Sequence, residues 1–489
     1  MRQLLIFGWL NLCIIATAQP PFGLDTTFRT DIETWLVYSI LEQEDSKVII
    51  SGQIKFPGDI YMRSGARLNI DGSKDDSYPY WAYMGGKLIP WEGKIYAGNG
   101  GIVRRLLPDG TMDPEFIFAM TNDPLFTPLQ GGDFHVFPDG RIVMSGLHHL
   151  YDTEGTHLGL HNFIWFTNTG HVDTTRVHRK GNGAIYTFKE LPDGRFIVRG
   201  SGDQFEGQPV DRIFRLHADG SLDTTFNSGV HWGVAYSFSP LDDGRVYVGG
   251  RFRIAGVSDT LKLVRFMPDG TLDPTFSIPN FQLGSIPSVG GHGALVLGIY
   301  PYDEDHFIVM GQFQYVNGQP RRGICMINSN GELTWAFHES GVWPYYYQGV
   351  PEGAVRGIIP AMDGEHYYIY GNYHGYSDPY TDDPLQRFVS RLHASDFSVE
   401  VMERPQGERR LLLYPNPATE HVVVEYDLQG AERGEVLVRD PLGRTVHAMR
   451  VQERKGQFVL AMQAFSSGIY MLELRSGGRS IQVEKLIVQ

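Results

Sequence analysis

Short runs of alternating apolar and polar residues, each closed by a turn sequence rich in Gly and Asp, recur along most of the chain. The turn sequence Asp-Gly-Arg directly precedes the apolar runs at residues 142–146, 196–200 and 246–250. An Asp-Gly pair adopts the positive φ angles of a tight hairpin turn, so each copy predicts two antiparallel strands. Weaker copies bring the predicted hairpins to seven, at residues 45–52, 92–98, 303–311 and 363–371.

A second motif, Gly-x-Leu-Asp-x-x-Phe, falls between successive hairpins. In chain order, its full and weaker copies are Gly23–Phe28, Gly72–Tyr78, Gly110–Phe116, Gly170–Arg176, Gly220–Phe226, Gly270–Phe276 and Gly331–Phe337. Successive copies begin 38 to 61 residues apart, and an apolar run of strand length precedes each copy after the first. This period suits a four-stranded propeller blade better than a leucine-rich or ankyrin repeat.

The repeats predict an all-β protein whose residues 19–402 form a seven-bladed β-propeller. The first copy of the second motif precedes any hairpin, whereas the last predicted third strand, Val389–Leu392, is followed only by a poor copy. We therefore expect Leu24–Phe28 to supply the outer strand of the last blade and to close the ring. In the competing interpretation, Ser398–Met402 supplies that strand.

These repeats resemble the delta-60 family, whose units combine an Asp-Gly-Lys/Arg hairpin, a Val-Gly-Gly exit and a Ser-Leu-Asp-x-x-Phe ending. The stretch Leu241–Phe276 matches almost throughout, and the resemblance extends over roughly residues 23–395. It implies a propeller architecture and no single activity. The second blade departs from the pattern, because Gly98–Ile102 leaves almost no loop.

Both ends of the chain differ from the repeats. Residues 1–18 have the basic start, short apolar run and Ala-Thr-Ala cleavage sequence of a signal peptide. No later apolar stretch approaches the about 20 residues of a transmembrane helix. A linker at 403–410 leads to residues 411–489, whose short alternating strands predict a small Ig-like β-sandwich.

This last segment resembles the type A sorting domain of the type IX secretion system. The matching sequences are Tyr-Pro-Asn-Pro near its start, Asp-Pro-Leu-Gly-Arg in the middle, Ser-Gly-Ile-Tyr and a basic-apolar end. The residues that carry the match are Tyr414, Pro415, Asn416, Pro417, Gly443, Gly468, Tyr470 and Lys485. The resemblance implies the type IX secretion machinery as a partner and a secreted or outer-membrane, cell-surface location. An ordinary accessory sandwich is the alternative.

The formal net charge is −14, and the acidic excess lies upstream of the sorting segment. Nucleic acid is excluded as a partner, because phosphate binding needs a basic surface. After Cys13 is removed with the signal peptide, Cys325 remains alone and no intramolecular disulfide can form. We expect a monomer.

One face of the predicted propeller carries short Asp-Gly turns, and the opposite face carries long, variable loops. Binding residues concentrate in such loops on a rigid scaffold. Exposed Trp and Tyr rings suit stacking on sugars or anchoring of a protein, so we expect a binding module for a surface glycan or protein. The candidate ligand-binding residues are Trp35, Trp81, Trp232, Trp343, Tyr346, Tyr373 and Tyr376. The alternative is that these rings pack between blades.

Metal and catalytic chemistry have weaker support in the sequence. The histidine cluster, which lies beside Asp152 and Glu154, fits no closed zinc motif, and the aspartates near residue 380 lack the EF-hand order. The recurrent motif aspartates favour a turn or inter-strand role, because a catalytic pair occurs once in a ring. We expect no metal, cofactor or catalytic residue; a carbohydrate-active enzyme with carboxylates at the channel is the alternative. The residues considered are His148, His149, His157, His161, Asp378, Asp382, Asp383, Asp25, Asp113, Asp223 and Asp273.

Overall fold

The computed structural model describes residues 22–80, 83–99, 101–116, 123–284, 293–347, 350–394, 411–428, 433–440, 444–476 and 479–488. The chain forms two compact units, of which the first is Phe22–Ala394 and the second contains the described residues from Leu411 onwards. Apart from one 3-10 turn, η2 (Met462–Ala464), the regular elements of the described residues are strands. The all-β class predicted from the sequence is confirmed. No helix in the described part has the length and apolarity to cross a membrane.

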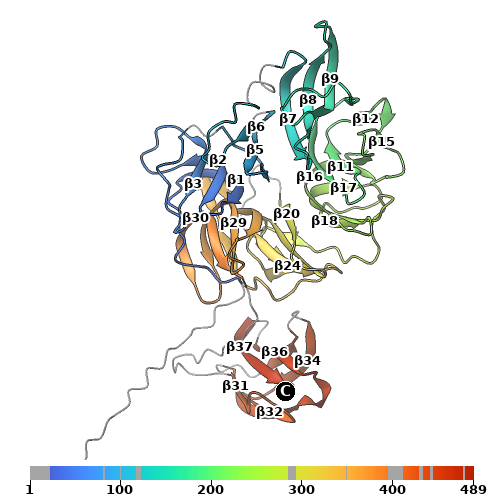
Figure 1. Ribbon diagram of the computed structural model, residues 1–489. Helices are drawn as coiled ribbons and strands as arrows, with labels where there is room; N and C mark the ends of the chain where they lie inside the picture. The colour runs from blue at the N-terminus through green and yellow to red at the C-terminus, as the bar shows by residue number, and fades with distance from the viewer. Residues whose placement is uncertain are drawn as a thin grey trace, which may run out of the picture. The chain divides into compact units, whose positions relative to one another are not determined.

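Among the described residues of the first unit, seven larger antiparallel sheets, called sheets 1 to 7 in chain order, follow one another, and three small sheets lie in their connections (Figure 1). The first strands of the sheets are β1 (Thr34–Glu42), β4 (Leu88–Trp91), β7 (Phe126–Val136), β10 (Ile185–Glu190), β16 (Val230–Pro240), β20 (Leu295–Pro301) and β28 (Ala354–Pro360). The second strands are β2 (Val48–Lys55), β5 (Lys94–Asn99), β8 (Ile142–Tyr151), β11 (Phe196–Gly200), β17 (Val246–Ile254), β21 (His306–Gln312) and β29 (His366–Ser377). The third strands are β3 (Arg63–Leu68), β6 (Ile102–Leu106), β9 (His157–Phe166), β14 (Ile213–Leu216), β18 (Leu261–Phe266), β24 (Ile324–Asn328) and β30 (Asp382–His393).

A fourth strand is present only as a short piece at the Leu-Asp of the second motif. In sheet 4 it is β15 (Leu222–Asp223), and elsewhere it is a single bridge such as Leu106↔Met112. The strand ends there because the motif aspartate folds the chain into a turn, as Asp113 does by accepting a hydrogen bond from the Glu115 N–H at 3.0 Å. The remaining short strands decorate the connections: β12 (Gln204–Phe205), β13 (Gln208–Pro209), β19 (Phe281–Gln282), β22 (Tyr315–Val316), β23 (Gln319–Pro320), β25 (Gly341–Trp343), β26 (Tyr345–Tyr347) and β27 (Val350–Glu352).

Apolar layers lie between successive sheets. Adjacent residues of each second strand point to opposite faces of their sheet and so belong to two different layers. In β2, for example, Ile49 packs between sheets 1 and 2, whereas Ile50 packs between sheets 7 and 1. This burial on both faces explains why the second strands are continuous apolar runs. Seven layers separate the seven described sheets. An open stack would have one layer fewer, so the layer between Val48 of sheet 1 and Tyr368 of sheet 7 closes the succession.

The N-terminal segment completes sheet 7. Leu24 forms an antiparallel bridge with Leu392 of β30, flanked by hydrogen bonds from the Asp25 N–H to the Arg391 carbonyl and from the His393 N–H to the Gly23 carbonyl, both 2.9 Å. The first and last parts of this unit are therefore joined through the backbone, as expected for Leu24–Phe28. The other candidate, residues 398–402, lies outside the described residues.

A repeated ion pair explains the spacing that recurs inside the second motif. In sheet 2, the Arg105 Nε donates to Asp113 Oδ2 at 2.6 Å, and its guanidinium lies 4.9 Å from the Phe116 ring. The Nη1 of the same arginine donates to the Asn168 carbonyl in the turn of sheet 3 at 2.6 Å. One side chain thus links strand, turn and neighbouring sheet. Equivalent Arg–Asp pairs are Arg67–Asp75, Arg215–Asp223, Arg265–Asp273 and Arg391–Asp25.

The second unit contains two sheets around one apolar core. Their strands, in the orders β31-β32-β35 and β34-β33-β36-β37, are β31 (Leu411–Tyr414), β32 (His421–Asp427), β33 (Gly434–Arg439), β34 (Thr445–Val451), β35 (Lys455–Ala461), β36 (Gly468–Ser476) and β37 (Arg479–Val488). Val422 and Val424 of the first sheet pack with Leu472 and Leu474 of the second, all four fully buried. The alternating pattern of β32 and β36 therefore marks which residues face the core.

Candidate functional site

At most junctions between successive sheets the first strands lie beside one another, and β28 lies beside β1. Between sheets 2 and 3, β7 instead lies beside β5 and β6. Most of the first strands carry a β-bulge at which one residue drops out of the pairing register. The skipped residues are Tyr38, Tyr186, Tyr236, Leu297 and Arg356. A bulge redirects the side chain of its unpaired residue. These side chains meet their neighbours: the Arg356 guanidinium lies 4.9 Å from the Tyr38 ring, and Gln130 donates to the Tyr186 hydroxyl at 2.7 Å.

Sequence reasoning missed these bulge residues. The signal that could have found them is a small residue that follows a bulky one, as in Tyr38-Ser39, Tyr186-Thr187, Tyr236-Ser237 and Arg356-Gly357. The small side chain is needed where neighbouring sheets approach, since a Cβ on Gly298, which follows the skipped Leu297, would lie 2.7 Å from the Arg356 carbonyl oxygen of sheet 7. The alternation that defines a strand conceals a single inserted residue, so the hydrophobic pattern alone does not reveal it.

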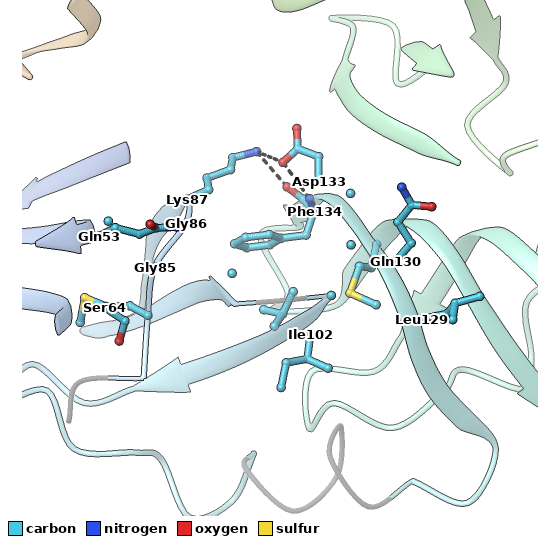
Figure 2. A pocket seen from close by; sticks show the side chains of 18 of the residues that line it. Gln53, Ser64, Gly85, Gly86, Lys87, Ile102, Leu129, Gln130, Asp133 and Phe134 are labelled. Carbon is cyan, nitrogen blue, oxygen red and sulfur yellow. Dashed lines mark hydrogen bonds and ion pairs between the residues drawn. The ribbon is translucent and has the colours of Figure 1, made fainter. Parts of the chain in front are cut away.

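A cavity of about 800 Å³ opens among sheets 1, 2 and 3 (Figure 2). It lies at sheet 2, where β5 ends at Asn99 and β6 already begins at Ile102. The short connection predicted at Gly98–Ile102 therefore leaves space that a longer loop would fill. Much of the wall is bare backbone, contributed by Gly52, Gly85, Gly86, Gly98, Gly101, Gly131 and Gly132.

The polar side chains that line this first cavity include one ion pair. The Lys87 Nζ lies 3.0 Å from Asp133 Oδ1 and donates to the Phe134 carbonyl at 2.8 Å, as Figure 2 shows. Gln53, Ser64 and Gln130 add neutral hydrogen-bonding side chains. Asp133 is the one carboxylate among the described residues that line the cavity. The arrangement offers many hydrogen-bonding positions and a single acid that is already paired.

A second cavity of about 400 Å³ lies among sheets 4, 5 and 6. Its lining consists of Arg212, Trp232, Gly233, Val234, Tyr236, Arg251 and Leu295. The Trp232 side chain is 44% exposed although the Arg251 and Arg253 guanidinium carbons lie 5.2 and 5.3 Å from its ring centre. Tyr236, a bulge residue, is 40% exposed. The cavity therefore combines cations with accessible aromatic surface.

The structure places the predicted aromatic residues in different environments. Trp232 lines the second cavity, Trp343 is 42% exposed beside Arg322, and Trp35 is partly buried against the core. The sequence placed Tyr373 and Tyr376 on the binding face as well, whereas the structure buries both completely. Trp81 and the Tyr346 side chain lie outside the described residues.

The two buried tyrosines have interior partners. The Tyr373 hydroxyl donates to Ser390 Oγ at 3.0 Å, and the Tyr376 hydroxyl donates to the Phe22 carbonyl at 3.1 Å. Burial raises the pKa of both phenols far above the usual value. Their ring faces are covered, which leaves them as packing residues of sheet 7.

The recurrent aspartates form structural ion pairs with arginines. Asp113, Asp223, Asp273 and Asp25 each pair with the arginine of the adjacent third strand, and the pKa of each carboxyl is held below its usual range. Burial opposes this shift, and hydrogen bonds from Thr or Lys side chains, backbone N–H groups and arginine overcome it.

The candidate metal ligands have other partners. His148 is buried, and its Nε2 lies 3.1 Å from the Ser145 carbonyl; the rings of His149 and His157 face each other at 2.9 Å between nitrogens. His161 lies near the Gly159 carbonyl. In sheet 7, Asp378 accepts from backbone N–H groups such as that of Leu24 at 3.0 Å.

One group of three potential ligands gathers among the described residues, namely Asp25, His366 and His393. Asp25 Oδ2 already accepts from the Arg391 Nε at 2.6 Å. A guanidinium at this distance occupies the position that a cation would need, so the group is an ion-pair cluster at the junction of the chain's first and last segments. Cys325 is likewise inert, because burial raises the pKa of its thiol to about 12.

In the second unit, the motif residues join the two ends of the segment. Asn416 Nδ2 donates to the Lys485 carbonyl at 2.5 Å, and Asn416 Oδ1 accepts from the Ile487 N–H at 2.9 Å. The Ala418 N–H extends this contact along β37. Tyr470 donates to the Ser466 carbonyl at 3.0 Å, and Gly468 precedes it at the start of β36.

The outer residues of the motif are partly accessible. Tyr414 is 45% exposed, and Lys485 is half-buried, which lowers the pKa of its ammonium. Within 414–417, Asn416 is therefore the residue that joins the start of the segment to the last strand. Gly443 lies outside the described residues.

Comparison with protein families gives one match in each unit. Residues 412–489 match the secretion system C-terminal sorting domain. Residues 191–226 and 241–276 match a β-propeller domain of unknown function. These two matches bear out the resemblances drawn from the repeats and from the C-terminal motifs. No curated protein matches the chain.

Several solved structures share weak likeness with the chain. PorZ, described as an essential bacterial surface component of the type-IX secretion system of Porphyromonas gingivalis, is 12% identical with a TM-score of 0.36, and the match covers 97% of this chain and 60% of PorZ. The extracellular domain of a putative one-component system from B. thetaiotaomicron is 10% identical, with a TM-score of 0.21 and coverages of 93% and 79%. AztD of Citrobacter koseri is 13% identical, with a TM-score of 0.20 and coverages of 93% and 94%. At these TM-scores the likenesses carry no inference about function.

Proposed function

We propose that this secreted or cell-surface protein, which consists of β-propeller repeats and a C-terminal sorting domain, is a seven-bladed propeller that binds a surface glycan or protein. The proposed boundaries are a signal peptide at 1–18, the propeller at 19–402, a linker at 403–410 and an Ig-like sorting domain at 411–489. The sorting domain brings the type IX secretion machinery as a partner during export. The propeller is proposed to act as a monomer.

The observation that carries the proposal is the pair of open cavities at the ends of the regular sheets. Each sheet packs through the same kind of apolar layer, and most sheets have the same Arg–Asp pair. The cavity linings differ in their polar groups, since the first has a Lys87–Asp133 ion pair and the second has two arginines beside exposed aromatic rings. Features shared by all repeats maintain the scaffold, and features confined to one place supply specificity. Both cavities fall within about 300–1,000 Å³, the usual range for ligand sites.

A carbohydrate-active enzyme needs two carboxylates about 5–10 Å apart across the bond to be cleaved. Among the described lining residues of the two cavities, only Asp133 is acidic, and Lys87 is paired with it. The recurrent aspartates are engaged by arginine. Binding without turnover is therefore the function we propose.

The test uses the mature full chain on a panel of immobilised neutral and charged glycans and surface proteins. Variants Gln130→Ala and Trp232→Ala alter the first and second cavity, and Arg141→Ala alters an exposed turn outside both. Binding should weaken in one cavity variant and remain unchanged in Arg141→Ala. Reducing-end assays on the same polysaccharides report turnover. Release of new reducing ends, or binding that no cavity variant affects, would contradict the proposal.

A further inference from the structure

The second cavity is surrounded by arginines that have no acidic partner among the described residues. Arg212 and Arg251 line it directly. Arg199 lies close by, with its guanidinium 4.5 Å from the Tyr186 ring, and its Nε is buried without a hydrogen-bond partner in the described part. In the described residues, neither of the two lining arginines forms an ion pair, unlike the paired arginines of the repeats.

The neighbourhood of the cavity is short of negative charge. Burial lowers the pKa of Arg199, and the positive charge of Arg212 lowers it further. Burial and the charge of Arg251 lower the pKa of Lys262, and the negative charge of Asp259 opposes this shift without cancelling it. Asp211, the acid next in sequence to Arg212, is turned to other partners, since its Oδ2 accepts from the Gly229 N–H at 2.7 Å. A cationic site is thus maintained in a protein whose net charge is −14.

Aromatic surface complements these cations. Trp232 and Tyr236 expose 44% and 40% of their surface beside the arginines. The backbone between them approaches the next strand closely: a Cβ on Gly233 would lie 2.2 Å from the Arg251 carbonyl. This glycine lets Trp232 and Arg251 share one small site. Flat rings stack on sugar faces, and guanidinium groups form paired hydrogen bonds with carboxylate or sulfate oxygens.

We propose that the second cavity binds an acidic glycan, a polysaccharide that carries carboxylate or sulfate groups, through Arg212, Arg251, Trp232 and Tyr236. This inference rests on the proposed binding function and names its ligand class. An acidic peptide would satisfy the arginines as well, but polyacidic side chains offer no apolar sugar face on which the exposed aromatic rings could stack. The combination therefore favours a sugar that is charged.

The test measures binding of the mature full chain to four probes: hyaluronate, which carries carboxylates only, dextran sulfate, which carries sulfates only, neutral dextran and polyglutamate. At least one acidic polysaccharide should bind at least about tenfold more tightly than dextran and polyglutamate. Comparison of the affinities for hyaluronate and dextran sulfate then identifies the preferred anion. The Arg212→Gln, Arg251→Gln double variant should weaken this binding by at least about tenfold, the effect of losing one charge-assisted hydrogen bond.

Two controls separate binding from folding. Arg141→Gln removes one charge from an exposed turn and should bind like the wild type. The Arg212→Lys, Arg251→Lys variant keeps both charges and should bind more tightly than the glutamine pair. Equal binding of dextran and the acidic glycans, preference for polyglutamate, absence of binding to both acidic glycans, or full binding by the glutamine pair would overturn the inference. Binding of a neutral glycan or a protein through the first cavity, together with no binding of either acidic glycan, would preserve the proposed function and overturn this inference.

Discussion

Replacing Asp273 with alanine should destabilise the propeller far more than a surface charge substitution does. Asp273 Oδ2 accepts from the Arg265 Nε at 2.7 Å and the Arg245 Nη1 at 3.1 Å, and Oδ1 accepts from the Thr275 N–H and hydroxyl at 2.8 and 2.6 Å. The side chains of Asp273 and Arg265 are only 2% and 3% exposed. Removing one partner of a buried ion pair costs about 3–5 kcal/mol, because the other charge stays buried and uncompensated. We expect a loss of that size in the free energy of unfolding.

The matched control is Asp243→Ala, because Asp243 pairs with the same Arg245 but is 49% exposed. An exposed pair contributes about 0–1 kcal/mol. Urea unfolding followed by tryptophan fluorescence reports on the first unit, since every tryptophan after residue 18 lies at or before Trp343. Equal losses in the two variants, or a loss below about 1 kcal/mol for Asp273→Ala, would refute the view that the repeated pair holds the sheets together.

Three further predictions follow from individual contacts. Burial lowers the pKa of His374 from 6.5 to about 4, so between these pH values the unfolded chain binds more protons than the folded chain. The stability that depends on neutral His374 should therefore be complete above pH 6.5 and fall as the pH is lowered towards 4. The Tm of His374→Phe should lose part of this pH dependence. Asn416→Ala removes two hydrogen bonds to β37 and should destabilise the sorting domain by about 1–2 kcal/mol, seen as faster amide hydrogen exchange in β37, whereas Tyr414→Phe should leave exchange unchanged. Gly132→Ala should destabilise the propeller in thermal unfolding, because its Cβ would lie 2.3 Å from the Ile185 carbonyl; an unchanged Tm would contradict the close approach of β7 and β10.

The regular part of the fold could be predicted because short segments within each repeat determine its turns and strands. Asp-Gly turns fix the hairpins, and the alternation around them fixes which residues face a neighbour. The role of the motif aspartate was predicted as a turn or inter-strand contact, and Asp113 does both. The sequence pattern does not reveal its arginine partner, because Arg105 lies eight residues earlier on a strand whose polar positions resemble solvent-facing ones.

The candidate site was harder to predict, since aromatic residues in loops look alike in sequence. Tyr376 and Trp343 lie in neighbouring strands of sheet 7, yet one is completely buried and the other is 42% exposed. Burial depends on which sheet packs against the strand, a long-range property that a local pattern does not contain. The sequence does not show that Arg251 and Arg253 lie beside Trp232, because only the pairing of β16 with β17 brings these side chains together at one cavity.

A closed ring of sheets requires the two ends of the propeller to be joined, and an engineered disulfide tests this joining directly. Leu24 and Leu392 face each other as a non-hydrogen-bonded antiparallel pair, the arrangement whose Cα separation suits a disulfide. The Leu24→Cys, Leu392→Cys double variant of the full chain, purified under oxidising conditions, should yield one intramolecular crosslinked peptide by mass spectrometry. The contradicting result is free thiols at both positions in the folded double variant, with the thiol at position 392 as reactive towards a thiol reagent there as in the single Leu392→Cys variant. That result would show that another segment pairs with β30 and that the ring closes differently.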